Sequence, residues 1–62
     1  MKIGFIGLGN VGGKLAGSLL RNGFDLTVRD LNQEIARPFL DEGAKWGESP
    51  KEMTENSDLI IT

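Results

Sequence analysis

The chain has 62 residues, of which seven are basic and nine acidic, and it contains neither cysteine nor histidine. A chain of this length forms at most one small domain, which buries only about 60% of the surface that its unfolded form exposes. Because cysteine and histidine are absent, disulfides, the usual zinc sites and histidine-based acid–base catalysis are excluded from these residues. The two signs of charge are interspersed and sum to −2, which argues against a nucleic-acid or membrane surface. A small molecule is the expected partner, and the cytoplasm or an organelle matrix is the expected location.

Residues 2–13 combine a buried strand, a glycine-rich turn and the start of a helix. Residues 3–6 form an almost wholly apolar run, as in a parallel strand covered on both faces. Gly7, Gly9 and Gly12 follow with G-x-G-x-x-G spacing. In this pattern the first glycine makes a tight turn, the second lets the backbone approach a phosphate, and the third lets the helix lie against the strand. The amino end of that helix presents unpaired N–H groups to the anion, which predicts a pyrophosphate site.

Helix and strand signals then alternate along the chain. From residue 10 the apolar residues recur at helical spacing, which predicts a helix over residues 10–22, with Gly23 in the left-handed position after its end. Residues 26–28 are apolar or β-branched and predict a second strand. Asn32 suits the N-cap of a second helix, which Gly43 ends.

The rest of the chain continues this alternation, with one misfit. Pro38 lacks an N–H group and disrupts a helix interior, so we expect a kink there or a helix that starts late. Residues 44–46 predict a short third strand from their position and one aromatic residue. Residues 49–52, Ser-Pro-Lys-Glu, have the N-cap, N1 and N3 residues that open a third helix. Residues 59–61 form a final apolar strand.

The alternation of strands and helices predicts an α/β fold. We expect a partial Rossmann-type, doubly wound parallel sheet with the order β-α-β-α-β-α-β along the chain and the strand order 3-2-1-4. The last strand has an apolar edge with unpaired backbone groups, which natural sheets usually blunt. We therefore expect the parent polypeptide to continue with at least two more strands. Residues 1–62 are interpreted as the N-terminal portion of a dinucleotide-binding domain.

Asp30 supplies the second half of a dinucleotide fingerprint. It follows the second strand about 20 residues beyond the glycines, where a carboxylate accepts hydrogen bonds from the adenosine ribose. A carboxylate would repel a 2′-phosphate, so the expected cofactor is NAD rather than NADP. Arg29 keeps NADP as the alternative, because a guanidinium is able to pair with such a phosphate. The favoured interpretation of Arg29 is a solvated side chain at the end of a strand.

The expected cofactor-binding residues are the glycine turn and the segment after the second strand: Gly7, Leu8, Gly9, Asn10, Val11, Gly12, Asp30, Leu31 and Asn32. Asn10 either contacts the pyrophosphate or only tolerates the turn. Trp46 is interpreted as cover for the core rather than as an adenine-stacking group. Glu48 is interpreted as an exposed charge at a helix end. No catalytic residue and no metal ligand is assigned within this chain.

The segment Gly4–Gly12 resembles the N-terminal signature of the β-hydroxyacid dehydrogenase family. This family includes 3-hydroxyisobutyrate dehydrogenase, tartronate semialdehyde reductase and 6-phosphogluconate dehydrogenase. The Gly43-Ala44 pair, the Ser49-Pro50 helix start and the Asp58–Thr62 segment resemble family features in the same order. Val11 departs from the family, which commonly has methionine at this place. The similarity runs along the whole chain.

The resemblance also bears on the cofactor and the reaction. Members that prefer NADPH tend to carry Asn-Arg-Thr after the second strand, whereas the segment Asp30-Leu31-Asn32 resembles the NAD-preferring branch. The family implies an enzyme similar to 3-hydroxyisobutyrate dehydrogenase, which transfers a hydride between NAD and a small β-hydroxyacid with a lysine as acid/base. In the family the catalytic groups, and a helical second domain that commonly mediates dimerisation, lie downstream of the position of Thr62. We expect this chain alone to lack them, and the parent to be a homo-oligomer.

Two alternatives stay open at this point. One is a non-catalytic dinucleotide-binding or sensing module that keeps the fold without the reaction. The other is a different Rossmann dehydrogenase with a similar N-terminus, such as a nucleotide-sugar or pyrroline-carboxylate enzyme.

Overall fold

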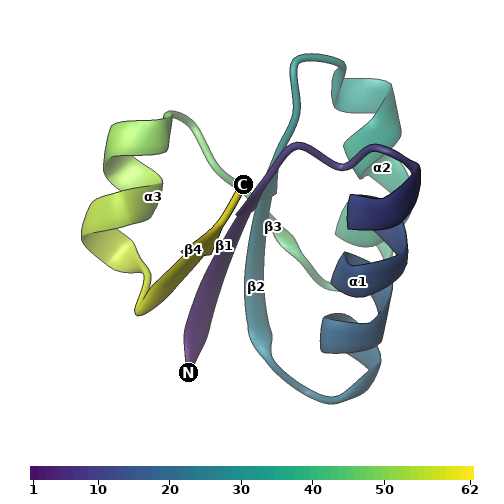
Figure 1. Ribbon diagram of the computed structural model, residues 1–62, viewed down its shortest axis with the longest axis horizontal. Coiled ribbons are helices and arrows are strands. Elements are labelled where there is room, and N and C mark those ends of the chain that lie inside the picture. Colours follow the sequence, from purple (N-terminus) through teal and green to yellow (C-terminus); the bar gives the residue numbers. More distant parts are fainter.

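The structure is a computed structural model that describes the backbone of residues 1–62 and the side chains of residues 1–9 and 12–62. Its elements are β1 (Lys2–Ile6), α1 (Asn10–Arg21), β2 (Asp25–Arg29), α2 (Gln33–Asp41), β3 (Lys45–Trp46), α3 (Pro50–Asn56) and β4 (Leu59–Ile61). The strands form a parallel sheet in the order β3-β2-β1-β4, which confirms the predicted fold class and strand order. Helices α1 and α2 cover one face of the sheet and α3 covers the other (Figure 1).

The hydrophobic core lies between the sheet and the helices α1 and α2. Its buried side chains are Ile3, Phe5, Leu8, Ala16, Leu26, Val28, Ala36 and Ala44. Alternate residues of β1 and β2 contribute to it, because successive side chains of a strand point to opposite faces. Trp46 is half-buried and packs against this core, which confirms its interpretation as core cover.

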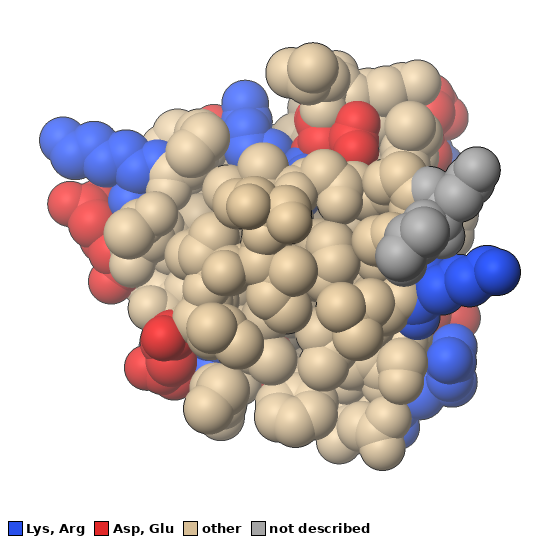
Figure 2. Space-filling view, viewed as in Figure 1, with Lys and Arg blue, Asp and Glu red and all other residues tan. Residues whose placement is uncertain are grey.

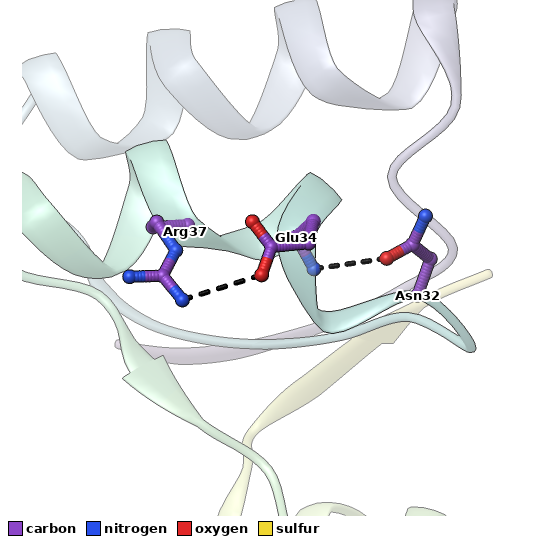
Figure 3. Close-up of polar contacts among 3 residues, drawn as sticks. All are labelled: Asn32, Glu34 and Arg37. Carbon is purple, nitrogen blue, oxygen red and sulfur yellow. Dashed lines mark hydrogen bonds and ion pairs between the residues drawn. The ribbon is translucent and has the colours of Figure 1, made fainter.

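The helix ends follow the predicted capping signals. The side-chain oxygen of Asn32 accepts a hydrogen bond from the N–H of Glu34 at 3.0 Å and starts α2 (Figure 3). The hydroxyl of Ser49 caps α3 in the same way. Gly23 and Gly43, directly after the C-caps of α1 and α2, have φ angles of 84° and 109°. Residues with such angles terminate helices, and glycine adopts them without strain.

Pro38 lies inside α2, which begins at Gln33 directly after its cap. The alternative of a late helix start is therefore wrong. Proline leaves the carbonyl of Glu34 without its helical partner. Glu34 and Pro38 are both exposed, so water can hydrogen-bond to that carbonyl in place of the missing N–H.

Apolar side chains remain exposed at the edge of the sheet. Leu59 of the edge strand β4 is 47% exposed. Figure 2 shows charged side chains of both signs around the margin of one face and a broad uncharged area in its middle. The continuation of the parent polypeptide beyond this strand stays a prediction.

Among the residues that the structure describes, no helix is both long enough and apolar enough to cross a membrane.

Candidate functional site

The predicted site residues gather where the carboxyl ends of β1 and β2 meet. Residues 7–9 connect β1 to α1, and residues 30–32 connect β2 to α2. The N–H of Gly7 donates a hydrogen bond to the carbonyl of Arg29 at 2.9 Å, so the glycine turn is held against the end of β2. In open parallel sheets, ligands bind outside the carboxyl ends of the strands.

The backbone geometry explains two of the three fingerprint glycines. Gly7 has a φ of +90°, a conformation that other residues adopt only with strain. A Cβ atom on Gly12 would lie 2.7 Å from the carbonyl oxygen of Gly7 and 3.1 Å from Cε1 of Phe5. Helix α1 therefore starts so close to the strand that no side chain fits between them.

Gly9 has a different environment from the other two glycines. It is the N-cap residue of α1, and a Cβ atom there would meet nothing within 4 Å. Glycine supplies no capping side chain, and the first turn of α1 has no acidic residue. Helices α2 and α3 each have a capping side chain and a glutamate in the first turn. The amino end of α1, with the positive end of its dipole, is therefore the one suited to an external anion.

Leu8 contributes its backbone to the site and its side chain to the core. The side chain is 3% exposed. The N–H of Leu8 donates to Oδ2 of Asp30 at 2.7 Å. Asn10 and Val11, which are also predicted to contact the cofactor, have side chains outside the described residues, and their contacts stay predictions.

The carboxylate of Asp30 connects the two loops of the site. Its Oδ2 accepts the hydrogen bond from Leu8, and its Oδ1 accepts one from the N–H of Asn32 at 3.0 Å. The hydrogen bonds from Leu8 and then Asn32 lower the pKa of Asp30 below its ordinary value, because they stabilise the charged form. Each carboxylate oxygen can accept a second hydrogen bond. Asp30 is therefore able to bind hydroxyl groups of a ligand while it holds the loops.

The lowered pKa of Asp30 predicts that acid loosens the site. Because the folded-state pKa lies below the unfolded-state value of about 3.9, the stabilisation is complete above that value. It is lost as the pH falls through the folded-state pKa. We expect the NMR signal of the Leu8 amide to stay constant from neutral pH to about pH 4 and to shift below it. In Asp30→Asn this acid transition should be absent; a transition of the same size in both proteins would contradict the assignment.

Leu31 and Asn32 complete the turn after β2. Leu31 is fully exposed. Asn32 caps α2, whose first turn also holds the ion pair between Glu34 and Arg37 at 3.3 Å (Figure 3). Asn32 thus supports Asp30 through its N–H and orients α2 through its side chain.

A hollow of about 630 Å³ lies next to Asp30, at the carboxyl ends of β2 and β3. Its lining residues are Arg29, Asp30, Leu31, Asn32, Gln33, Trp46 and Glu48. A second hollow, of about 380 Å³, is lined by residues that include Lys2 and Asp25 at the amino ends of β1 and β2. Asp30 lines the first hollow and not the second, so we place the candidate site at the first hollow. Trp46 and Glu48 also line this hollow, although neither is among the residues predicted to bind the cofactor.

Arg29 is half-buried and hydrogen-bonded, so its interpretation as a solvated side chain is wrong. Its Nη1 donates to the carbonyls of Gly47 at 2.7 Å and Glu48 at 2.8 Å. Its Cζ lies 5.5 Å from the centre of the Trp46 ring, within range of a cation–π interaction. These contacts depend on the pairing of β2 with β3, which places Val28 opposite Trp46.

Residues 2–62 match the family model of the NAD binding domain of 6-phosphogluconate dehydrogenase. Two curated relatives are similar over 60 residues. The probable mitochondrial 3-hydroxyisobutyrate dehydrogenase of Arabidopsis thaliana is 38% identical, and the 3-sulfolactaldehyde reductase of Escherichia coli K12 is 40% identical. Each match covers 97% of this chain but only 17% and 20% of the two relatives. The chain therefore spans less than a quarter of the length of the proteins it resembles.

Solved structures of reductases have the same fold. An imine reductase from Pseudomonas sp. superposes with a TM-score of 0.90 at 35% identity, covering 97% of this chain and 21% of that one. An imine reductase variant from Myxococcus stipitatus, in complex with NAD+, has a TM-score of 0.89 at 25% identity and covers 95% and 21%. A reductive aminase from Aspergillus terreus, in complex with NADPH, has a TM-score of 0.88 at 28% identity and covers 97% and 21%. The structural neighbours thus include complexes with each of the two cofactors.

Proposed function

Because the chain belongs to the family of the NAD binding domain of 6-phosphogluconate dehydrogenase, we propose that it forms the N-terminal part of an NAD-dependent oxidoreductase acting on a small β-hydroxyacid. The observation that carries the proposal is the junction of the glycine turn with Asp30, through the hydrogen bond from Leu8. This junction brings an anion-binding helix terminus and a hydroxyl-binding carboxylate to one edge of the sheet. A dinucleotide carries both complementary groups, a pyrophosphate and a ribose.

The pyrophosphate is proposed to lie at the amino end of α1, against Gly9. The N–H groups of the first helical turn have no partners within the helix, and the dipole favours negative charge there. The absence of a Cβ atom at Gly9 lets a phosphate approach the backbone closely. The ribose hydroxyls of the adenosine half are proposed to donate hydrogen bonds to Asp30.

NAD is the proposed cofactor, because the surroundings of Asp30 disfavour the 2′-phosphate of NADP. The charge of Asp30 disfavours a phosphate beside it. Leu31, the next residue, is exposed and offers no positive partner. The Nη1 atom of Arg29 is already bonded to two carbonyls. When bound, the nicotinamide ring supplies the hydride acceptor or donor; the described residues bind and orient the adenosine and pyrophosphate.

The proposed substrate class is supported by the names of two relatives. The Arabidopsis and Escherichia coli proteins are named for a β-hydroxyacid and a sulfonated aldehyde. The catalytic groups of the parent are proposed to lie outside residues 1–62, in a homo-oligomeric protein of the cytoplasm or an organelle matrix. Imine reduction is a second candidate, favoured by the 35% identity to the Pseudomonas imine reductase. Assays of the parent protein with 3-hydroxyisobutyrate and with a cyclic imine would separate the two activities.

The variant Gly9→Ala tests the pyrophosphate position without creating a steric clash. Its new methyl group meets no protein atom within 4 Å, and the φ of −57° is ordinary for alanine. We expect the melting temperature to fall by a few degrees at most, because alanine is a poorer N-cap than glycine, and the affinity for NAD, measured by titration calorimetry, to fall at least about tenfold.

Gly13→Ala is the matched control on the same helix. Its methyl group would make ordinary contacts, the shortest being 3.4 Å to the carbonyl of Leu8, and it should leave NAD affinity unchanged. If Gly9→Ala binds NAD as tightly as the unchanged protein, the pyrophosphate does not lie where we propose.

A further inference from the structure

We propose that Arg29 is a positioning residue for the adenine end of the site: it holds the turn after β3 in place and does not bind a 2′-phosphate. The inference rests on the proposed function, because it takes the hollow next to Asp30 as the place of the adenosine. It assigns a role to a side chain that otherwise marks the chain as a candidate for NADP.

Arg29 fixes the turn after β3 through two consecutive carbonyl groups. Its Nη1 donates to Gly47 and Glu48, and hydrogen bonds from a guanidinium are stronger than those between neutral groups. The N–H of Gly47 also donates to the carbonyl of Val28 at 2.9 Å, which continues the pairing of β2 with β3. The turn is therefore attached to β2 by both a backbone and a side-chain contact.

The same side chain also contacts the aromatic ring in the hollow. The guanidinium carbon lies 5.5 Å from the centre of the Trp46 ring, and Arg29, Trp46 and Glu48 all line the hollow. Asp30, Leu31 and Gln33 line it from the turn after β2. Arg29 thus determines the distance between the two walls of the hollow, because it ties the turn after β3 to the end of β2.

Arg29 and Asp30 act on different neighbours, because β2 lies between β1 and β3 in the sheet. Asp30 binds the N–H of Leu8 in the turn after β1, whereas Arg29 binds the turn after β3. A residue that shapes the hollow in this way should affect the binding of ligands that carry adenosine, with or without a 2′-phosphate. It should not affect the binding of the nicotinamide half of the cofactor.

The test compares Arg29→Met and Arg29→Lys, with NAD, NADP and nicotinamide mononucleotide as ligands in titration calorimetry. We expect Arg29→Met to lower the affinity for NAD about tenfold and the affinity for NADP by the same factor. The affinity for nicotinamide mononucleotide should stay unchanged. Arg29→Lys keeps the charge but lacks the planar guanidinium that lies over the Trp46 ring while its Nη1 bonds to both carbonyls, so it should also lose NAD affinity. Arg21→Met is the control. It removes the same charge at the exposed last turn of α1 and should change none of the three affinities.

Any other pattern of affinities for the three ligands overturns the proposal. A loss confined to NADP would show that Arg29 binds the phosphate, and an unchanged NAD affinity would show that the turn does not shape the site. An equal loss for nicotinamide mononucleotide would indicate general destabilisation. The NMR signals of Gly47 and Glu48 without ligand give a separate readout, which Arg29→Met should shift. If the unsubstituted protein binds no NAD, the proposed function is contradicted. If Arg29→Met nevertheless shifts the signals of Gly47 and Glu48, the attachment of the turn by Arg29 is established.

Discussion

Asp30→Asn is expected to weaken NAD binding by about 10- to 100-fold, because hydrogen bonds to a charged acceptor are stronger than those to a neutral one. The amide keeps an acceptor oxygen but loses the charge that binds ribose hydroxyls. It also keeps fewer acceptor positions for Leu8 and Asn32, whose N–H groups the carboxylate now holds. Repulsion of a 2′-phosphate disappears with the charge, so the affinity for NADP should rise relative to that for NAD.

The measurement for Asp30→Asn is a pair of titrations, with NAD and with NADP. Glu34→Gln is the matched control, because Glu34 is a nearby carboxylate whose ion pair with Arg37 is exposed and which does not line the hollow. It should change neither affinity appreciably. An NADP-to-NAD affinity ratio that stays constant in Asp30→Asn would refute the role of Asp30 in cofactor choice.

Gly12→Ala is expected to have the largest effect on the fold. The new methyl group would lie 2.7 Å from the backbone oxygen of Gly7, which cannot rotate away as a side chain can. Inserting a methyl group into such a contact costs about 1 to 3 kcal/mol, and the helix and turn would separate to relieve it. The melting temperature should fall by several degrees, and NAD affinity should fall with it because α1 carries the anion site.

Gly13→Ala is again the control for Gly12→Ala, since it makes the same chemical change one residue further along α1. Alanine is preferred over glycine inside a helix by about 1 kcal/mol, so this variant should be as stable as the unchanged protein or more stable. Thermal unfolding followed by circular dichroism measures both variants. Equal stability of Gly12→Ala and Gly13→Ala would mean that the contact with Gly7 is not tight in solution.

The features that could be predicted from the sequence are those determined by short-range bonds or by periodicity. Asn32 and Ser49 cap their helices through N–H groups two and three residues away, so the signal and its partner lie in one short segment. The parallel sheet and its order followed from alternating strands and helices, which have few compatible topologies. The family resemblance carried by the glycine segment is confirmed by the match over residues 2–62.

The features that could not be predicted depend on contacts between distant segments. Asp30 was expected to bind a ribose, but its bond to Leu8 spans 22 positions and requires β1 and β2 to be adjacent in register. The bonds from Arg29 to Gly47 and Glu48 require the pairing of β2 with β3. Of the two outcomes expected at Pro38, a kink or a late start of α2, the late start was wrong, and the exposure of Pro38 could not be read from its local sequence. Substrate identity lies outside a chain that spans 17% to 20% of the two relatives.

The most direct test of the central claim is a crystal structure of the protein grown with NAD. We expect the pyrophosphate against Gly9 at the amino end of α1, with the adenosine ribose hydroxyls bonded to Asp30 and the adenine in the hollow beside Arg29. A dinucleotide bound elsewhere on the chain, with the glycine turn in contact with water alone, would contradict it.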